Sequence, residues 1–266
     1  MSVAIIIPAR HASTRYPGKP LAELTGATGE TQTLIERSWR AAMAVSGVDR
    51  VVVATDDKRI RDKAESIGAD IVMTSEACRN GTERCADALS VLGERYDIVV
   101  NLQGDAPLTP AWFIEDLVSG LRENPEFDVA TPVLRADGDT LNSFLEDRRN
   151  GRVGGTTAIF GTNQQALYFS KEVIPFCDQT FAPNDPTPVF HHVGVYAYRP
   201  NALAQYLDLP VGTYETLEGL EQLRFLENGT AMMCVEVDAK GRSFWELNNP
   251  EDIPRIEAML KAMNLP

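Results

Sequence analysis

The chain has 266 residues, 44% of them hydrophobic and 24% charged, which is typical of a globular protein with a substantial buried core. Its net charge of −13 argues against partners that need a basic face, so we expect no nucleic acid and no membrane among them. The apolar run Val3–Ile7 is too short for a secretion signal, and no segment approaches the roughly 20 apolar residues of a membrane span, so we expect a cytoplasmic protein.

The first half of the chain alternates strand-like and helix-like segments. Val3–Ile7 is a mostly β-branched run that ends at Pro8, a pattern typical of a buried parallel strand. Further strands are predicted at 51–54, 70–73, 98–102 and from 128 onward, and helices at 33–45, 57–67, 81–92 and 110–121. This alternation indicates βαβ units, so we predict an α/β fold with a Rossmann-like, mostly parallel sheet and helices on both faces.

The chain changes character near residue 150. Short strand-like pieces at 157–160, 166–169 and 193–198 surround a loop rich in Pro, Asn and Asp at 181–188, which indicates a small antiparallel insertion. A helical pattern returns at 216–227, a strand follows at 232–237, and a closing helix is predicted at 250–263, with Asn249 as its N-cap. We therefore predict one domain over 1–266 with an inserted substrate or dimerisation arm at about 150–200.

The loop after the first strand has the composition of a phosphate-binding loop. It carries three cations, Arg10, Arg15 and Lys19, together with Ser13, Thr14 and Gly18. Backbone N–H groups and cations can surround a triphosphate, although the Walker A pattern is absent. A solvated surface loop would have a similar composition. The position directly after a parallel strand favours a ligand site, because ligands of such sheets bind beyond the carboxyl ends of the strands.

A second polar loop follows the predicted strand at 98–102. Gln103, Gly104 and Asp105 place a carboxylate at a strand end, after a glycine that permits close approach of a ligand. A carboxylate in this position suits Mg²⁺ that bridges phosphate oxygens. A plain strand-to-helix turn is the alternative interpretation.

An ordered set of short motifs extends over nearly the whole chain. In chain order they are Pro8-Ala9-Arg10, Ser13-Thr14-Arg15, Pro17-Gly18-Lys19-Pro20, Ala54-Thr55-Asp56-Asp57, Met73-Thr74-Ser75, Gly81-Thr82-Glu83-Arg84, Gln103-Gly104-Asp105, His192-Val193-Gly194-Val195-Tyr196-Ala197-Tyr198-Arg199 and Leu220-Glu221-Gln222-Leu223-Arg224. The order of these motifs is more specific than any one of them, and the set resembles the 3-deoxy-manno-octulosonate cytidylyltransferase (CMP-Kdo synthetase) family.

The resemblance implies a nucleotidyltransferase of the nucleotide-diphospho-sugar transferase fold. CTP and 3-deoxy-D-manno-octulosonate (Kdo) would give CMP-Kdo and pyrophosphate for lipopolysaccharide biosynthesis, with Mg²⁺ as cofactor, in a homodimer. Carried over by position, the catalytic residues would be Arg10, Lys19 and Asp105. The nucleotide would contact Pro8, Ala9, Arg10, Ser13, Lys19, Thr74, Ser75, Asn80, Gly81, Thr82 and Gln103. The sugar acid would contact Arg84, His192, Tyr196, Glu221 and Gln222, and the metal would be held by Asp105 and Asn248.

The chain departs from the family pattern at several positions. Ala106 stands where the family has glutamate, Thr157 where it has lysine, and Asn248 where it has a second metal-binding aspartate; the glycines at 154 and 155 are a further local difference. Asn248 keeps one oxygen ligand but loses the charge. Asp105 with substrate phosphates, or a neighbouring acid such as Glu246 or Asp238, would have to compensate.

These departures leave two further hypotheses beside the Kdo enzyme. One is a cytidylyltransferase for another acidic sugar, such as a modified Kdo or a nonulosonic acid. The other is a non-catalytic relative that binds sugar nucleotides. Pyrophosphate release with any sugar acid would exclude the non-catalytic relative, and a panel of sugar acids would separate the two enzymes.

Overall fold

The structure is a computed structural model that describes residues 2–13, 16–93, 95–153, 155–242 and 245–266. It divides into two compact units. Unit 1 comprises Met1–Glu115, Tyr198–Leu207 and Ala239–Pro266; unit 2 comprises Asp116–Ala197 and Asp208–Asp238. The boundaries fall inside α4 (Ala111–Glu123) and β11 (Val195–Tyr198), so both elements contribute residues to each unit.

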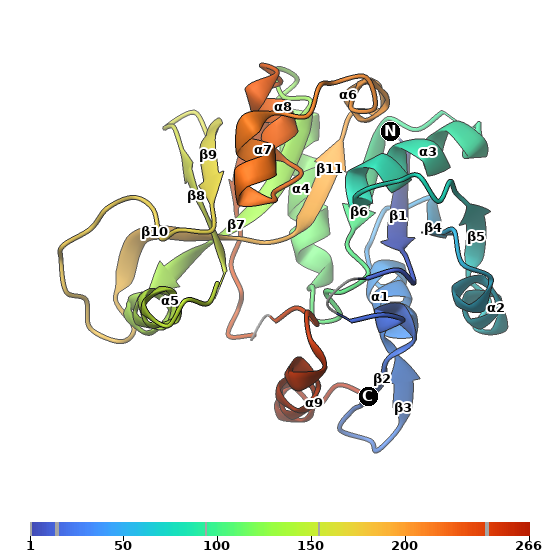
Figure 1. The fold of residues 1–266 in the computed structure, drawn as a ribbon, viewed down its shortest axis with the longest axis horizontal. Helices are drawn as coiled ribbons and strands as arrows, with labels where there is room; N and C mark the ends of the chain where they lie inside the picture. Colours follow the sequence, from blue (N-terminus) through green and yellow to red (C-terminus); the bar gives the residue numbers. More distant parts are fainter. Residues whose placement is uncertain (1, 14–15, 94, 154, 243–244) are drawn as a thin grey trace. The chain divides into compact units, whose positions relative to one another are not determined.

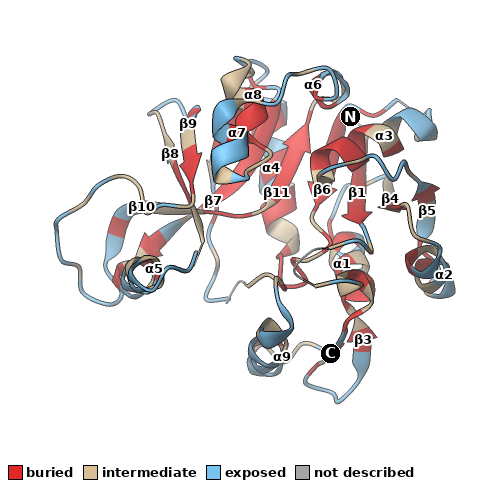
Figure 2. Ribbon diagram, viewed as in Figure 1, coloured by how far each residue is buried: buried red, intermediate tan, exposed pale blue. Residues whose placement is uncertain are grey.

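Unit 1 is built on four parallel strands in the order β5 (Asp70–Met73), β4 (Arg50–Thr55), β1 (Val3–Ala9) and β6 (Ile98–Leu102). Every residue of β1 and β6 is buried (Figure 2). These strands match the four predicted in this part of the chain. The order places β1 between β4 and β6, where an apolar run buried on both faces is expected.

Helices connect and cover these strands (Figure 1). The connecting helices are α1 (Leu34–Met43), α2 (Lys58–Ser66) and α3 (Gly81–Leu92). Asp57 caps α2 by accepting hydrogen bonds from the amides of Arg59 and Ile60, and Asn80 caps α3 by accepting one from Glu83 N at 2.8 Å. The predicted α/β class and the predicted helices of this half are therefore confirmed.

Unit 1 also contains small elements that the sequence did not reveal. A 3₁₀ turn η1 (Lys19–Leu21) is followed by an antiparallel hairpin of β2 (Glu23–Thr25) and β3 (Thr31–Thr33), and α6 (Pro200–Gln205) packs on α3. Leu24 packs in a cluster with Leu108, Ile256 and Leu260, which joins the hairpin to the closing helix.

Unit 2 contains the predicted antiparallel strands. β7 (Val129–Asp137) pairs with β10 (Pro186–His192) in antiparallel fashion and with β12 (Met232–Glu236) in parallel. β10 continues through β8 (Thr156–Phe160) to β9 (Ala166–Ser170), both antiparallel. The helix α5 (Gly138–Arg149) packs on β7 and β10.

Three predicted boundaries were wrong. The helix expected at 216–227 is two short helices, α7 (Thr213–Glu218) and α8 (Leu223–Glu227), because Gly219 ends α7 in a left-handed conformation with φ 62°. The closing helix starts as a 3₁₀ turn η2 (Pro250–Asp252) before α9 (Ile253–Ala262). The loop expected through residue 188 ends earlier, since β10 begins at Pro186.

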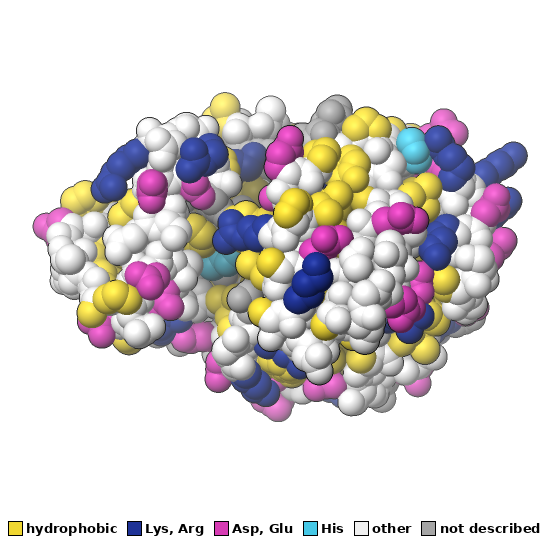
Figure 3. Space-filling view, turned by 90° about the horizontal axis from the view of Figure 1, so that it is seen from below, with side chains coloured by type: hydrophobic (Ala, Val, Ile, Leu, Met, Phe, Trp, Pro, Cys, Tyr) yellow, Lys and Arg dark blue, Asp and Glu magenta, His cyan; other side chains and the backbone are white. Residues whose placement is uncertain are grey.

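Two surface properties bear on the expected partners. Within the described ranges, no helix combines the length and hydropathy that crossing a membrane requires. On the face drawn in Figure 3, acidic and basic side chains are interspersed rather than gathered into one basic surface. The binding of extended nucleic acid would favour a continuous basic stripe.

Candidate active site

A polar cavity of about 180 Å³ lies in unit 1, at the loops that follow β1 and β6 and at the start of α3. The residues that line it include most of those predicted to bind nucleotide: Pro8, Ala9, Arg10, Ser13, Lys19, Asn80, Gly81 and Gln103. Arg84 and Asp105, predicted for the sugar and the metal, line the same cavity. The cavity therefore lies beyond the carboxyl ends of β1 and β6, at the edge of the sheet where the site is predicted.

Lys19 and Asp105 form an ion pair within this cavity. Lys19 Nζ donates to Asp105 Oδ2 at 2.6 Å, and the two side chains are 14% and 25% exposed. Gly18, with φ 73°, turns the chain in front of Lys19, and Gly104 lies so close to β1 that a Cβ would come within 2.9 Å of the Pro8 carbonyl oxygen. Both glycines are therefore required to bring the lysine and the carboxylate together.

The opposite wall is the N-terminus of α3. A Cβ on Gly81 would lie 2.5 Å from Gln103 Nε2, so a larger residue here would displace the Gln103 side chain. Arg10 reaches the same wall, where its Nη1 donates to the Arg79 carbonyl at 3.1 Å. A helix N-terminus flanked by an arginine and a lysine favours an anion such as phosphate.

Arg84 is buried on α3 and is held by two partners. Its Nη2 donates to Asp56 Oδ2 at 2.9 Å, and its Nη1 donates to Thr74 Oγ1 at 2.6 Å. The guanidinium is therefore fixed in orientation where it lines the cavity. In the sequence, Asp56 belongs to one of the family motifs and has no predicted role. Its position directly after β4 is the signal that could have indicated that it binds Arg84.

Several predicted nucleotide residues do not line the cavity. Thr74 accepts from Arg84, Ser75 N donates to Asp87 Oδ2 at 2.7 Å, and Thr82 is fully buried with its hydroxyl 2.9 Å from Tyr198 Oη. The side chains of Thr74 and Thr82 are thus bonded to neighbouring protein groups, and none of the three residues is in the lining of the cavity. The predicted loop residues Thr14 and Arg15, and Gly154, lie outside the described residues.

Asn248 lies next to the loop of Asp105. The amide of its neighbour Leu247 donates to the Asp105 carbonyl oxygen at 2.9 Å. Asp252 holds the turn, because its Oδ2 accepts from the amides of Asn248 and Asn249 at 2.9 and 2.7 Å. The two predicted metal ligands are thus on segments in direct contact.

The remaining predicted sugar contacts lie in unit 2, and three of them form a buried cluster. Tyr196 Oη is 3.1 Å from Gln222 Oε1, and the rings of His192 and Tyr196 are 5.6 Å apart. His192 Nε2 lies 2.9 Å from Thr131 Oγ1, and burial lowers the pKa of His192 to about 3, so its ring is neutral at physiological pH. Gln222 Nε2 is buried and has no hydrogen-bond partner among the described residues, so this amide group could donate to a ligand.

Three other residues of unit 2 complete the comparison with the predictions. Glu221, which precedes Gln222, is half-buried. His191 faces away from His192 and packs edge-on against Phe144 at 5.2 Å, as expected for neighbours on a strand. Thr157, at the position of the family lysine, is buried, and its hydroxyl donates to the Glu172 carbonyl oxygen at 2.6 Å.

The fold and the cavity are those of an α/β protein with a ligand pocket: a parallel sheet, and at the carboxyl ends of its strands a polar pocket lined by cationic side chains and a carboxylate. Residues 4–236 match the family model described as cytidylyltransferase, so the chain belongs to the cytidylyltransferase family and is a nucleotidyltransferase.

Individual relatives agree with this assignment. The chain is 47% identical to a 3-deoxy-manno-octulosonate cytidylyltransferase of Maricaulis maris, over 98% of both chains. It is 40% identical to an 8-amino-3,8-dideoxy-manno-octulosonate cytidylyltransferase of Shewanella pealeana, over 98% of this chain and 99% of that one. A solved structure of CMP:2-keto-3-deoxy-manno-octonic acid synthetase complexed with CTP is 31% identical and superposes over the full length of both chains with a TM-score of 0.82.

Proposed function

We propose that the protein is a 3-deoxy-manno-octulosonate cytidylyltransferase, which joins CTP and Kdo to give CMP-Kdo and pyrophosphate. The observation that carries the proposal is the 47% identity to the Maricaulis maris enzyme over nearly the whole of both chains. The cavity supports it, because cationic side chains and a helix N-terminus surround a space next to a carboxylate.

In this reaction the C2 hydroxyl oxygen of the sugar acid attacks the α-phosphorus of CTP, and pyrophosphate leaves. The protein has to align the two substrates and neutralise the phosphates. Arg10 and Lys19, which line the cavity, would bind the triphosphate, and Ser13, Asn80 and Gly81 of the same lining would lie around it. Pro8, Ala9 and Gln103 would contact the nucleoside, and Thr74, Ser75 and Thr82 would support that wall.

For the sugar acid we propose two sets of contacts. Arg84 offers a fixed guanidinium, which suits a carboxylate. His192, Tyr196, Glu221 and Gln222 offer neutral and acidic hydrogen-bonding groups, which suit sugar hydroxyls. Gln222 Nε2 is the donor that lacks a partner.

We propose Mg²⁺ as the cofactor, and the donor set fits it. Asp105 is the carboxylate in the lining of the cavity, and Asn248 can add an amide oxygen; both are oxygen ligands of the kind Mg²⁺ accepts. Across the described residues, no group of three or more His, Cys, Asp or Glu could hold a metal, so phosphate oxygens would supply the other ligands. When bound, the ion would neutralise charge that develops on the phosphates.

A second candidate is a cytidylyltransferase for an amino-substituted Kdo. Two observations favour it: the 40% identity to the Shewanella pealeana enzyme, and Thr157 in place of the family lysine. A position that is neutral instead of cationic could change the preferred substituent on the sugar. Thr157 is bonded to backbone groups of unit 2, so it would act through the shape of its surroundings.

The test is pyrophosphate release from CTP, Mg²⁺ and either Kdo or its 8-amino analogue, with a blank that contains no sugar. We expect release with Kdo that Asp105→Ala abolishes and that Asp62→Ala, an exposed acid on α2, leaves unchanged. Faster turnover of the 8-amino sugar would support the second candidate. If neither sugar led to pyrophosphate release, the result would favour the hypothesis of a non-catalytic relative.

We also propose a homodimer that works in the cytoplasm, in lipopolysaccharide biosynthesis. The family model spans residues from both units, which supports one nucleotidyltransferase domain over 1–266 with unit 2 carrying the arm predicted at about 150–200. Light scattering coupled to size-exclusion chromatography would measure the mass. An isolated protomer of 29.3 kDa would contradict the dimer.

A further inference from the structure

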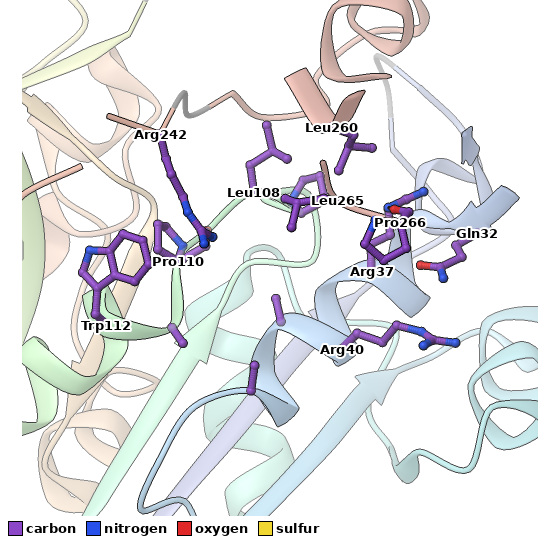
Figure 4. A pocket seen from close by; sticks show the side chains of 15 residues that line it. Gln32, Arg37, Arg40, Leu108, Pro110, Trp112, Arg242, Leu260, Leu265 and Pro266 are labelled. Carbon is purple, nitrogen blue, oxygen red and sulfur yellow. The ribbon is translucent and has the colours of Figure 1, made fainter. Parts of the chain in front are cut away.

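Unit 1 has a second cavity, separate from the candidate active site. Its volume is about 320 Å³, and it lies against α1, the segment 107–112 and the residues around Leu265 (Figure 4). It shares no lining residue with the first cavity. A volume of this size falls at the lower end of the range for small-molecule sites.

The charge of this cavity is opposite to that of the chain. Among the described residues that line it are three arginines, Arg37, Arg40 and Arg242, and no Asp or Glu. Arg40 is already paired with Glu36 at 2.9 Å on the same helix. Arg242 has no ion pair with any residue in the described part of the chain, so its charge is available to a ligand.

Arg242 and an aromatic ring form one side of the cavity. The Arg242 guanidinium carbon lies 4.8 Å from the centre of the Trp112 ring, and Figure 4 shows the guanidinium beside Pro110, turned toward the cavity. Lys240 Nζ lies 4.7 Å from the same ring. Two cations held at one indole give this side a positive potential over an apolar surface.

Two polar side chains of the lining have unmet hydrogen-bonding capacity. Arg37 is buried; its Nη1 and Nη2 donate to main-chain oxygens of Pro266 and Leu24 at 2.5 and 2.8 Å, while its Nε has no partner among the described residues. The hydroxyl of Thr109 is also buried without a partner. A ligand oxygen that reaches Nε or this hydroxyl would supply the missing partner.

We propose that this cavity is a binding site for a small organic anion with a planar or apolar body. Its carboxylate or phosphate would meet Arg242, its body would lie against Trp112 and Leu108, and a further oxygen would meet Arg37 or Thr109. The rest of the lining is mainly apolar, which a fully hydrated inorganic ion would not match. The inference does not depend on the nucleotide chemistry, since it uses no residue of the candidate active site.

The experiment uses the whole chain and the indole N–H signals of its three tryptophans in ¹H–¹⁵N NMR spectra. Trp112→Phe assigns one signal to Trp112. Phenyl phosphate and benzoate are the probes, which separates phosphate from carboxylate recognition, and benzyl alcohol is the neutral control. CTP is added in a parallel series to show whether the two cavities fill independently.

We expect a saturable shift of the Trp112 signal by at least one of the two anions, with a Kd of about 1 mM, and little effect of benzyl alcohol. Arg242→Gln should weaken binding about tenfold, while Arg61→Gln on α2, which lines no part of the cavity, should leave it unchanged. Absence of a saturable shift, equal binding of benzyl alcohol, or full affinity in Arg242→Gln would each overturn the proposal. Arg242 is exposed, so this variant keeps the fold intact.

Discussion

Arg224 and Glu215 form a buried ion pair in unit 2 that links α8 to α7. Their side chains are 2% and 10% exposed, and Arg224 donates from Nε and Nη2 to the two carboxylate oxygens at 2.8 and 2.6 Å. Replacing one member leaves the other charged, buried and unpaired. Such a break costs about 3–5 kcal/mol, because the desolvation of the remaining charge is no longer offset.

Arg224→Met should therefore lower the free energy of unfolding by about 3–5 kcal/mol. With a urea dependence of about 2 kcal/mol per molar, the unfolding midpoint should fall by about 2 M. The double variant Arg224→Met/Glu215→Leu should cost less than Arg224→Met alone, because no charge is left buried. Urea unfolding followed by circular dichroism measures all three proteins.

The matched control is Arg152→Met. Arg152 also bonds an acid, Asp147, but its side chain is 61% exposed, so its loss should cost no more than about 1 kcal/mol. If Arg224→Met lowered the free energy of unfolding no more than Arg152→Met does, the ion pair of Arg224 would have to be screened by solvent. A double variant less stable than Arg224→Met would refute the argument that the unpaired charge is the source of the loss.

Three further changes test other parts of the structure. Lys19→Met should reduce pyrophosphate release by about 100-fold through loss of a phosphate contact, with its urea midpoint nearly unchanged; full activity would remove Lys19 from the proposed site. Asn101→Leu should leave the free energy of unfolding unchanged or raise it, within about 1 kcal/mol, because both side-chain amide atoms of Asn101 are buried and unpaired among the described residues. A large loss of stability would show that Asn101 has a partner that its replacement removes. Burial lowers the pKa of His192 in the folded protein to about 3. At pH values between this pKa and the ordinary pKa of histidine, the unfolded chain binds more protons than the folded protein. The free energy of unfolding therefore falls as the pH falls. From pH 7 to pH 5 the His192 contribution should be a loss of about 2 kcal/mol, and an equal pH dependence in His192→Gln would contradict it.

The parts of the fold that could be predicted are those whose signal is local. β5 and β6 were predicted at their observed bounds because their apolar runs end at polar turn residues. The break at Gly219 was missed, because the helical pattern of apolar residues continues across it. The hairpin β2–β3 was missed because each strand has three residues and depends on packing against α9.

The candidate site shows the same division. The composition of the loops predicted that Arg10, Lys19 and Asp105 lie near one another, because the loops that follow parallel strands lie at the same edge of the sheet. It could not show that the hydroxyl of Thr82 turns into the interior, because that choice depends on Tyr198, more than a hundred residues further along the chain. Nor could it show that Asp56 fixes Arg84, a contact that exists only after β4 and α3 have packed.

The segmented composition of unit 1 has a consequence for how the protein is made. The strands β1, β4, β5 and β6 all lie in its first stretch, so they can pair while the ribosome is still producing unit 2. The Asp105 loop can reach its final structure only after the C-terminal segment has been made, because the amide of Leu247 donates to the Asp105 carbonyl oxygen. The cluster around Leu24 and Leu108 is likewise completed by residues of α9. A nascent chain stalled before residue 239 would thus have a sheet but an unfinished Asp105 loop, and Leu108 would lack the residues of α9 that cover it.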